Sequence, residues 1–298
     1  MVDGVCFGLA PSGPLDLRFL RPGDGTPVAV SEGVIDPVTD GRPPTAEWRP
    51  RPGNPHHARL YRDGSDARLW VDGVGWFAVD LAASAVVVPQ HVEPVRREQR
   101  LWGVPVLLLR GGTGEVPLHA AAVDVDGQAL VIVAPGRAGK TTLAAAFHAA
   151  GHRLLTEDLA LVTSDGHPHV VPGPPTLRLR PDADARLSLQ DVSVLRRDPD
   201  RTYLLLDEHR RGDGAPVPVA GIVFLHGGEG RSLTRVGATE RLPELWSTSF
   251  SFEQDRAALF HRLASIAQSV PLWDLRRERT FESLPEVVGM LEGLCARA

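Results

Sequence analysis

The sequence predicts an α/β protein in which a domain with a mixed sheet follows a β-rich N-terminal domain. Up to about residue 92, short alternating apolar stretches are separated by Pro, Gly and Asp, a pattern typical of strands and turns. From Leu118 onward the apolar runs lengthen, and strand-like and helix-like segments alternate. We therefore divide the chain into a first domain of residues 1–112 and a second domain of residues 113–298.

The composition excludes several classes of protein. Hydrophobic residues make up 43% of the 298 residues, which is enough for an extensive core. The formal net charge of −5 argues against a nucleic-acid or membrane partner, because phosphate groups are bound by clustered positive charge. Cys6 and Cys295 have neither disulfide-framework nor metal-ligand spacing. Without a signal-peptide pattern or a long apolar run, we expect a cytoplasmic protein.

The first domain contains a predicted hairpin. Residues 67–71 and 74–79 flank Asp72-Gly73, and Asp-Gly favours the positive φ values of a two-residue type I′ turn. The pair His56-His57 lacks other ligands at metal spacing, so we interpret it as part of a solvated loop.

Residues 93–112 are expected to hold one short helix. Pro105 suits its first turn and Gly111 its end, while the charged stretch 96–100 is interpreted as a solvated face.

Further elements are expected late in the second domain. Apolar runs predict strands at about 202–206, 220–226 and 270–275, and helical spacing predicts helices at about 253–268 and 284–294. The segments 182–201 and 207–214 are polar, and we interpret the latter as a charged loop.

A strand–loop–helix motif carries the clearest functional signal. Residues 129–133 form a short β-branched run typical of a buried strand, and the alanine-rich segment 143–150 predicts a helix that ends at Gly151. The loop between them matches the phosphate-binding pattern G-x-x-x-x-G-K-[ST] except at its first position. Its residues, the predicted nucleotide-binding set, are Ala134, Pro135, Gly136, Arg137, Ala138, Gly139, Lys140, Thr141 and Thr142.

The chemistry of this loop suits ATP and Mg²⁺. Backbone N–H groups and the helix dipole favour an anion at such a turn. Lys140 is the only lysine among 32 basic residues, and its compact ammonium suits the β- and γ-phosphates better than a planar guanidinium does. Thr141 offers a hydroxyl to Mg²⁺. Ala134 replaces the first glycine of the pattern, which is tolerable if its φ is negative.

The turn before the strand places a histidine near the loop. Asp126-Gly127 predicts a second two-residue hairpin, and its register puts His119 across from residue 134. If this register holds, His119 lies beside the γ-phosphate; a purely structural role is the alternative.

Two adjacent acids, Glu157 and Asp158, follow the helix between apolar stretches. Neighbouring residues on a strand point to opposite faces, so they serve one site only if the backbone bends between them. Burying them requires a cation, which Mg²⁺ and Lys140 would supply. A surface turn is the alternative reading of this pair.

Residues 118–162 resemble the catalytic domain of the HPr kinase/phosphorylase family. The shared features are a histidine that opens a strand, the P-loop, Gly151-His-Arg-Leu154, and the acidic pair after Thr156. A weaker resemblance at 174–179, 222–225 and 270–275 is to HPr-kinase-like proteins of peptide-modification gene clusters. The resemblance implies an HPr kinase/PEP carboxykinase-like fold.

The resemblance also implies an activity, the transfer of the γ-phosphate of ATP to a Ser/Thr-type hydroxyl. Lys140 and the loop amides would hold the phosphates, and Thr141 with the acidic pair, Glu157 and Asp158, would bind Mg²⁺. Asp158, assisted by His119, would accept the hydroxyl proton, although which acid is the base stays open. The expected partner is a peptide or protein, such as a ribosomal peptide natural product, and the first domain is a candidate for recognising it.

The sequence departs from the family at Gly136, Arg137 and Glu157, and it lacks the signature associated with the phosphorylase reaction. We therefore expect a kinase without phosphorylase activity. The alternatives are a kinase of a small hydroxylated metabolite and a nucleotide-binding regulator without turnover. A homo-oligomer and the choice between ATP and GTP are left open.

Overall fold

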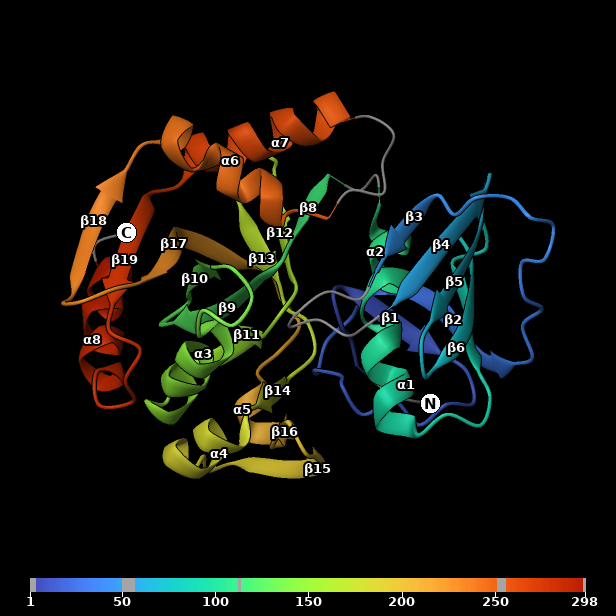
Figure 1. The fold of residues 1–298 in the computed structure, drawn as a ribbon, viewed down its shortest axis with the longest axis horizontal. Helices are drawn as coiled ribbons and strands as arrows, with labels where there is room; N and C mark the ends of the chain where they lie inside the picture. Colours follow the sequence, from blue (N-terminus) through green and yellow to red (C-terminus); the bar gives the residue numbers. More distant parts are fainter. Residues whose placement is uncertain (1–3, 50–56, 112–113, 251–255, 297–298) are drawn as a thin grey trace. The chain divides into compact units, whose positions relative to one another are not determined.

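The structure is a computed structural model that describes residues 4–49, 57–111, 114–250 and 256–296. The chain divides into two compact units, Met1–Gly111 and Gly112–Ala298. Both contain mixed sheets, and helices accompany them (Figure 1).

The first unit is built on a seven-stranded sheet with the order β1-β2-β7-β6-β5-β4-β3. The β1–β2 and β2–β7 pairs are parallel, and the other pairs are antiparallel. The strands are β1 (Leu9–Ser12), β2 (Thr26–Gly33), β3 (Ala46–Trp48), β4 (Ala58–Asp63), β5 (Asp66–Val71), β6 (Gly75–Asp80) and β7 (Ala85–Pro89). The β-rich character expected for this part of the chain is present.

The hairpin between β5 and β6 has a longer turn than predicted. Val71 pairs with Gly75, so three residues form the loop instead of two. Gly73 and Gly75 have positive φ values of 68° and 114°, whereas Asp72 does not have a positive φ. A type I′ turn requires two consecutive positive φ values, which Asp72 and Gly73 do not supply, and the register is one residue longer than predicted.

Two helices, α1 (Pro94–Leu101) and α2 (Val104–Arg110), occupy the segment where one was expected. Pro105 lies in the first turn of α2 and Gly111 caps its end, as predicted. The interpretation of 96–100 as a solvated face is wrong at Glu98, which is buried and accepts hydrogen bonds from the backbone N–H groups of Arg18 and Phe19. Burial raises the pKa of Glu98, although these hydrogen bonds oppose the shift.

One other interpretation in this unit needs correction. The ring of His57 lies 2.9 Å from a carboxylate oxygen of Glu47 and packs against Trp70, so it is not a freely solvated loop residue. Its neighbour His56 lies outside the described residues.

The second unit contains a nine-stranded mixed sheet. Seven strands follow the order β11-β9-β10-β17-β13-β12-β8, and β19 pairs with β17 and β18. The three strands β10, β17 and β19 are parallel neighbours, so their carboxyl ends meet at one edge. The strands are β8 (Glu115–Leu118), β9 (Ala120–Val125), β10 (Gln128–Val133), β11 (Arg153–Thr156), β12 (Ala160–Thr163), β13 (His169–Val171), β17 (Val217–Gly227), β18 (Ser232–Val236) and β19 (Leu272–Arg277).

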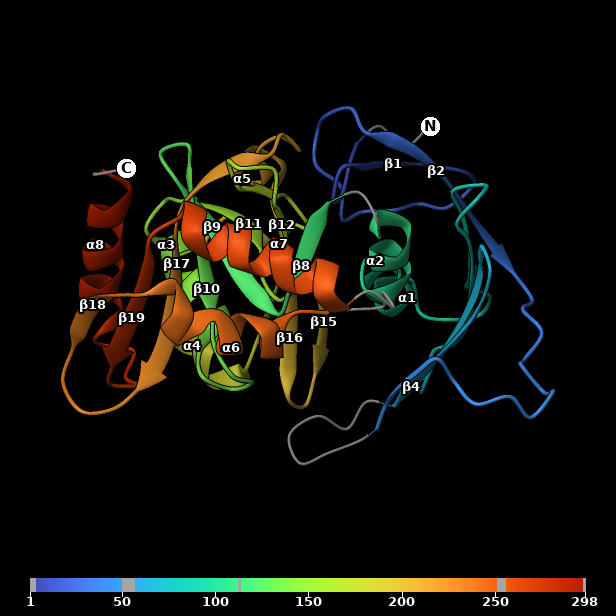
Figure 2. The ribbon, with the colours of Figure 1, turned by 90° about the horizontal axis from the view of Figure 1, so that it is seen from above.

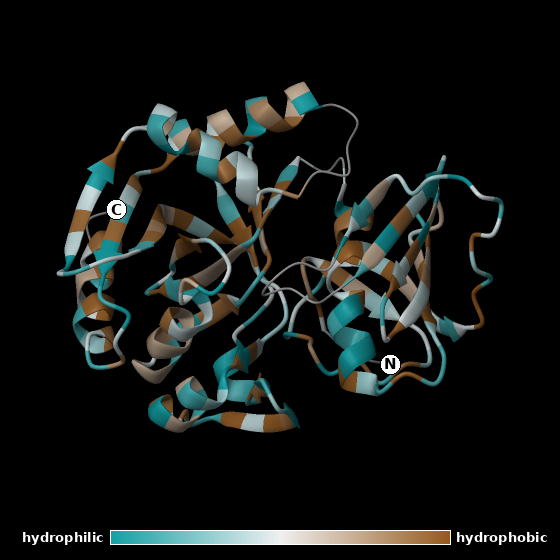
Figure 3. Cartoon of the chain, viewed as in Figure 1, coloured by the Kyte–Doolittle hydropathy of each residue, from teal (hydrophilic) through white to brown (hydrophobic). Residues whose placement is uncertain are grey.

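Helices cover both faces of this sheet. On one face, α3 (Lys140–Ala149) and α8 (Leu284–Cys295) share a core with Leu130 and Ile132 of β10; on the other, α6 (Ala238–Thr248) and α7 (Arg256–Ser269) pack against Val131 and Val133. Figure 2 shows α7 lying across the strands, and Figure 3 shows its alternating apolar and polar residues. Successive side chains of β10 point to opposite faces of the sheet, so they contribute to two separate cores.

A three-stranded sheet extends from the α3 side, in the region expected to be polar and irregular. Its order is β14-β16-β15, and the elements are β14 (Thr176–Leu179), α4 (Pro181–Leu187), β15 (Val192–Asp198), β16 (Arg201–Leu206) and α5 (Glu208–Arg211). Its arginines contact the protein itself: Arg197 pairs with Asp184, and Arg210 donates to the carbonyl oxygen of His148. The predicted strand at 202–206 is present, whereas α4, α5 and β15 were not predicted.

The remaining predictions for the second unit agree with the structure. The strands expected at 220–226 and 270–275 correspond to β17 and β19, and the helix at 284–294 corresponds to α8. The helix expected from 253 is present as α7, and the predicted positions 253–255 lie outside the described residues. In the described ranges, no helix combines the length and apolar composition that crossing a membrane requires.

Candidate functional site

The predicted phosphate-binding segment 134–142, termed the phosphate loop, runs from the end of β10 into the start of α3. Gly139 caps the helix with a φ of 99°, a left-handed conformation that glycine adopts at little cost. Arg137 also has a positive φ, 66°, and its side chain is exposed. Ala134 does not have a positive φ, which meets the condition set for an alanine in place of the first glycine. The loop therefore tolerates Ala134 without strain, whereas Arg137 holds a conformation that favours glycine.

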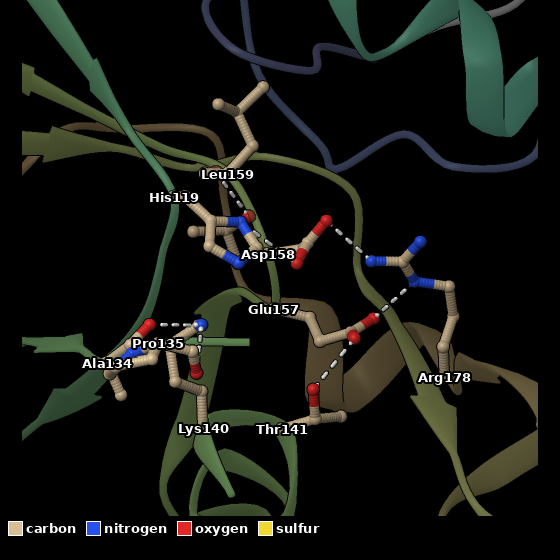
Figure 4. Close-up of polar contacts among 10 residues, drawn as sticks. His119, Ala134, Pro135, Lys140, Thr141, Glu157, Asp158, Leu159 and Arg178 are labelled. Carbon is tan, nitrogen blue, oxygen red and sulfur yellow. Dashed lines mark hydrogen bonds and ion pairs between the residues drawn. The ribbon is translucent and has the colours of Figure 1, made fainter. Parts of the chain in front are cut away.

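Lys140 is the first residue of α3 and is buried, with 6% of its surface exposed. Its Nζ donates to the carbonyl oxygen of Ala134 at 2.7 Å, and so the ammonium lies over the loop (Figure 4). Burial lowers the pKa of Lys140, while the charges of Asp158 and Glu157 act in the opposite direction.

His119 lies at the break between β8 and β9. The β9–β10 hairpin has the predicted register, with Gln128 opposite Val125 and Val133 opposite Ala120, and both turn residues have positive φ. One step further along this register, His119 is level with residue 134. Its backbone N–H donates to the carbonyl oxygen of Thr248 on α6 at 2.7 Å, which fixes the strand at this point.

The acidic pair lies in a bend between β11 and β12. Thr156 Oγ1 donates to the carbonyl oxygen of Leu159 at 2.7 Å, closing the turn around both acids. Glu157 accepts a hydrogen bond from Thr141 Oγ1 at 3.0 Å and is only 7% exposed. Asp158 lies with one oxygen 3.4 Å from His119 Nδ1 and is 46% exposed. The bend turns both carboxylates toward one site, yet gives them different neighbours (Figure 4).

Arg178 of β14 joins the two acids. Its Nε donates to Glu157 at 3.0 Å, and its Nη2 lies 2.7 Å from Asp158. Sequence reasoning missed this residue because it comes from a separate small sheet about twenty positions along the chain. An arginine within an otherwise apolar strand, 176–179, was the available signal.

The electrostatics of the site keep Asp158 ionised and His119 neutral. Although burial raises the pKa of Asp158, the charges of Arg178 and Lys140, and of His119 once it is protonated at low pH, hold that pKa well below its usual range. Burial lowers the pKa of His119. The negative charge of Asp158 opposes this shift, and the positive charges of Lys140 and Arg178 add to it. The pKa of Arg178 is raised mainly by Glu157. At neutral pH the site therefore holds a neutral imidazole next to an ionised carboxylate.

Of the three residues predicted to bind Mg²⁺, Thr141 and Glu157 contact each other beside the loop, whereas Asp158 contacts His119 and Arg178. A hydroxyl and a carboxylate, 3.0 Å apart beside the phosphate loop, are hard oxygen donors of the kind that Mg²⁺ prefers. Among the described residues, no group of three or more His, Cys, Asp or Glu side chains is arranged around a common ion. Mg²⁺ usually takes only one or two carboxylates and completes its shell with phosphates and water, so two protein donors suffice.

We expect Arg178→Gln to destabilise the protein at neutral pH. The change leaves Glu157 and Asp158 without their shared cation, and the free energy of unfolding should fall by about 1–3 kcal/mol, below the cost of a fully buried pair because Arg178 is 31% exposed. Urea unfolding at pH 7 and pH 3 measures the effect, with Arg180→Gln, at an exposed position next to β14, as the control.

The pH dependence of this variant has a defined sign. In the wild type, the lowered pKa of Asp158 contributes stability that is present above its unfolded value, roughly 4, and lost as pH falls through the folded pKa. Arg178→Gln removes that contribution, so the difference in unfolding free energy between variant and wild type should hold from pH 7 to about 5 and shrink as pH falls below about 4. A difference that stays constant between pH 7 and pH 3 would contradict the assigned role of Arg178.

Comparisons with known proteins give a distant structural likeness. No family model and no curated protein matches the chain. Among solved structures, the HPr(Ser) kinase/phosphatase from Coxiella burnetii matches with a TM-score of 0.33 and 10% sequence identity, over 61% of this chain and 94% of that chain.

Proposed function

We propose that the chain is an ATP-dependent, Mg²⁺-requiring kinase that transfers the γ-phosphate to a Ser/Thr-type hydroxyl of a peptide or protein. The observation that carries the proposal is the convergence of Lys140, Thr141–Glu157 and His119–Asp158 at the mouth of one phosphate loop (Figure 4). Phosphoryl transfer needs little covalent chemistry from a protein, so catalysis rests on positioning and charge.

The residues divide into two groups. Lys140 and the backbone N–H groups at the start of α3 bind the phosphates. The positive end of the α3 dipole lies at the same place and favours their negative charge. Thr141 and Glu157 hold Mg²⁺ at the buried part of the site, since Glu157 is only 7% exposed. When bound, ATP supplies the phosphoryl group, and Mg²⁺ neutralises part of the charge on the phosphates.

Asp158 and His119 form the part of the site that meets the hydroxyl to be phosphorylated. Asp158 is 46% exposed and His119 34% exposed, so a hydroxyl can reach them from solvent. Asp158 is the base that accepts the hydroxyl proton, because it is ionised and accessible, whereas Glu157 is only 7% exposed and accepts a hydrogen bond from Thr141. His119 orients the Asp158 carboxylate.

The direct test is phosphate transfer by the purified full-length chain with ATP and Mg²⁺. The acceptor panel should contain peptides encoded by neighbouring genes, free hydroxyl amino acids and sugars, with intact mass spectrometry as the readout. A phosphorylated peptide supports the proposal. Phosphate on a free amino acid or sugar favours a small-metabolite kinase, and calorimetric ATP binding without product from any acceptor overturns the kinase in favour of a regulator.

A further inference from the structure

Arg277, the last residue of β19, is a buried arginine next to the phosphate loop. The parallel register pairs it with Gly227, and Val133, Phe224 and Asp274 form the corresponding row at the end of β10. Arg277 is three residues after Asp274, and residue 136 of the loop is three residues after Val133. Arg277 is therefore level with residue 136. It lies two strands away from β10 at the edge where the loop begins.

The side chain points to the α3 face of the sheet. Leu275, two residues earlier on the same strand, belongs to the core shared with α3, and residues two apart point to the same face. The contact with the loop is close: a Cβ atom added at Gly139 would lie 2.8 Å from Arg277 Nη2. The guanidinium thus occupies the space that a side chain at Gly139 would need.

The charge of Arg277 is not compensated. Its residue surface is only 3% exposed, and its Nε has no hydrogen-bond partner among the described residues. Nη1 donates to the carbonyl oxygen of Glu278 at 3.3 Å. No carboxylate of the described residues forms an ion pair with it, and burial, together with the nearby charge of Arg279, lowers its pKa. A buried, unpaired cation is costly, so this arrangement calls for an anion.

The orientation also selects the kind of anion. Nε and Nη2 form one edge of the guanidinium, the edge used for bidentate contacts with carboxylates and phosphates. Nη1, on the other side, is the atom bound to Glu278. The unpaired edge includes the nitrogen that lies against Gly139 of the phosphate loop.

We propose that Arg277 is a phosphate-binding residue of this site, whose Nε–Nη2 edge contacts the phosphate chain of the nucleotide held by loop 134–142. The inference rests on the proposed function, since it needs a polyphosphate on that loop. Arg277 then supplies, from β19, a second cation beside Lys140. Nothing in the sequence motif indicates it, because the two residues are 137 positions apart.

The test measures the binding of ATP and of inorganic tripolyphosphate to the full chain by calorimetry. Arg277→Gln should weaken both about 10- to 100-fold, the usual value of a hydrogen-bonded charge pair. The salt dependence of the dissociation constant should weaken too, because one screened attraction is lost. The matched control is Arg276→Gln, a neighbouring arginine on β19 that is exposed, which should bind both ligands as the wild type does.

Stability separates this role from a structural one. Because the unpaired charge is costly, the Tm of ligand-free Arg277→Gln should not fall, while the Tm increase caused by tripolyphosphate should shrink. A Tm lower by more than about 4 °C in both Arg277→Gln and Arg277→Met, or failure of both to fold, assigns a structural role and overturns the inference. If only Arg277→Gln is unstable, binding by Arg277→Met decides.

The two proposals fail differently. If the wild type binds tripolyphosphate and the variant binds it within twofold of the wild type, the assignment of Arg277 is wrong and the proposed function stands. If the wild type binds neither ATP nor tripolyphosphate, both are wrong.

Discussion

Lys140→Ala is expected to lower phosphoryl transfer at least 10²- to 10³-fold, the usual cost of removing one preorganised charge from a transition state. Lys140 lies 2.7 Å from the Ala134 carbonyl at the entrance of the loop, and the rest of the loop lacks another ammonium. The variant should also bind ATP more weakly. Transfer rates from the mass-spectrometric assay and calorimetric affinities measure both effects.

Lys140→Arg is the sharper form of this experiment. It keeps the charge, but the planar guanidinium is longer and must fit where a compact ammonium is 6% exposed. We expect transfer to be as low as in Lys140→Ala, with circular dichroism showing a folded protein. More than a tenth of wild-type transfer in either variant would mean that Lys140 is not part of the chemistry.

Asp158→Asn is expected to stop transfer while leaving nucleotide affinity within about threefold of the wild type. The amide keeps the shape of the side chain but cannot accept the hydroxyl proton, and losing a general base costs about 10²- to 10⁴-fold. ATP affinity should survive because Asp158 lies on the outer side, near His119, away from the Thr141–Glu157 contact.

Glu157→Gln is the matched comparison for Asp158→Asn. It removes the carboxylate that Thr141 contacts, so it should weaken Mg²⁺-dependent ATP binding as well as transfer. Calorimetry with and without Mg²⁺ distinguishes the two acids. Near-normal turnover in Asp158→Asn together with lost turnover in Glu157→Gln would move the base to Glu157.

The fold was predicted best where the signal is local. The run 129–133, the alanine-rich helix and Asp126-Gly127 each encode their own structure, and β10, α3 and the β9–β10 register follow them. The prediction was weaker where tertiary contacts decide. The charged stretch at 96–100 was expected to be a solvated face, but Glu98 is buried and accepts hydrogen bonds from backbone N–H groups about 80 positions away in the chain.

The small sheet shows the same limit. Residues 192–198 are polar enough to be interpreted as a loop. They form β15 because they pair with the edge of β16, and Arg196 packs over Tyr203. Pairing of this kind depends on a partner strand and not on the apolar pattern of the segment itself.

By itself, the sequence determined the strand–loop–helix unit at 129–150, the position of Lys140 in it and the placing of His119, because a two-residue turn and a strand–loop–helix unit act over a few neighbouring residues. Only the tertiary structure decided how the two acids differ, which arginine joins them and which arginine lies against the loop. Arg178 comes from β14 and contacts both acids, and Arg277 comes from β19 and lies against Gly139. Such contacts cross long stretches of chain, so their charges meet only after the sheet has formed.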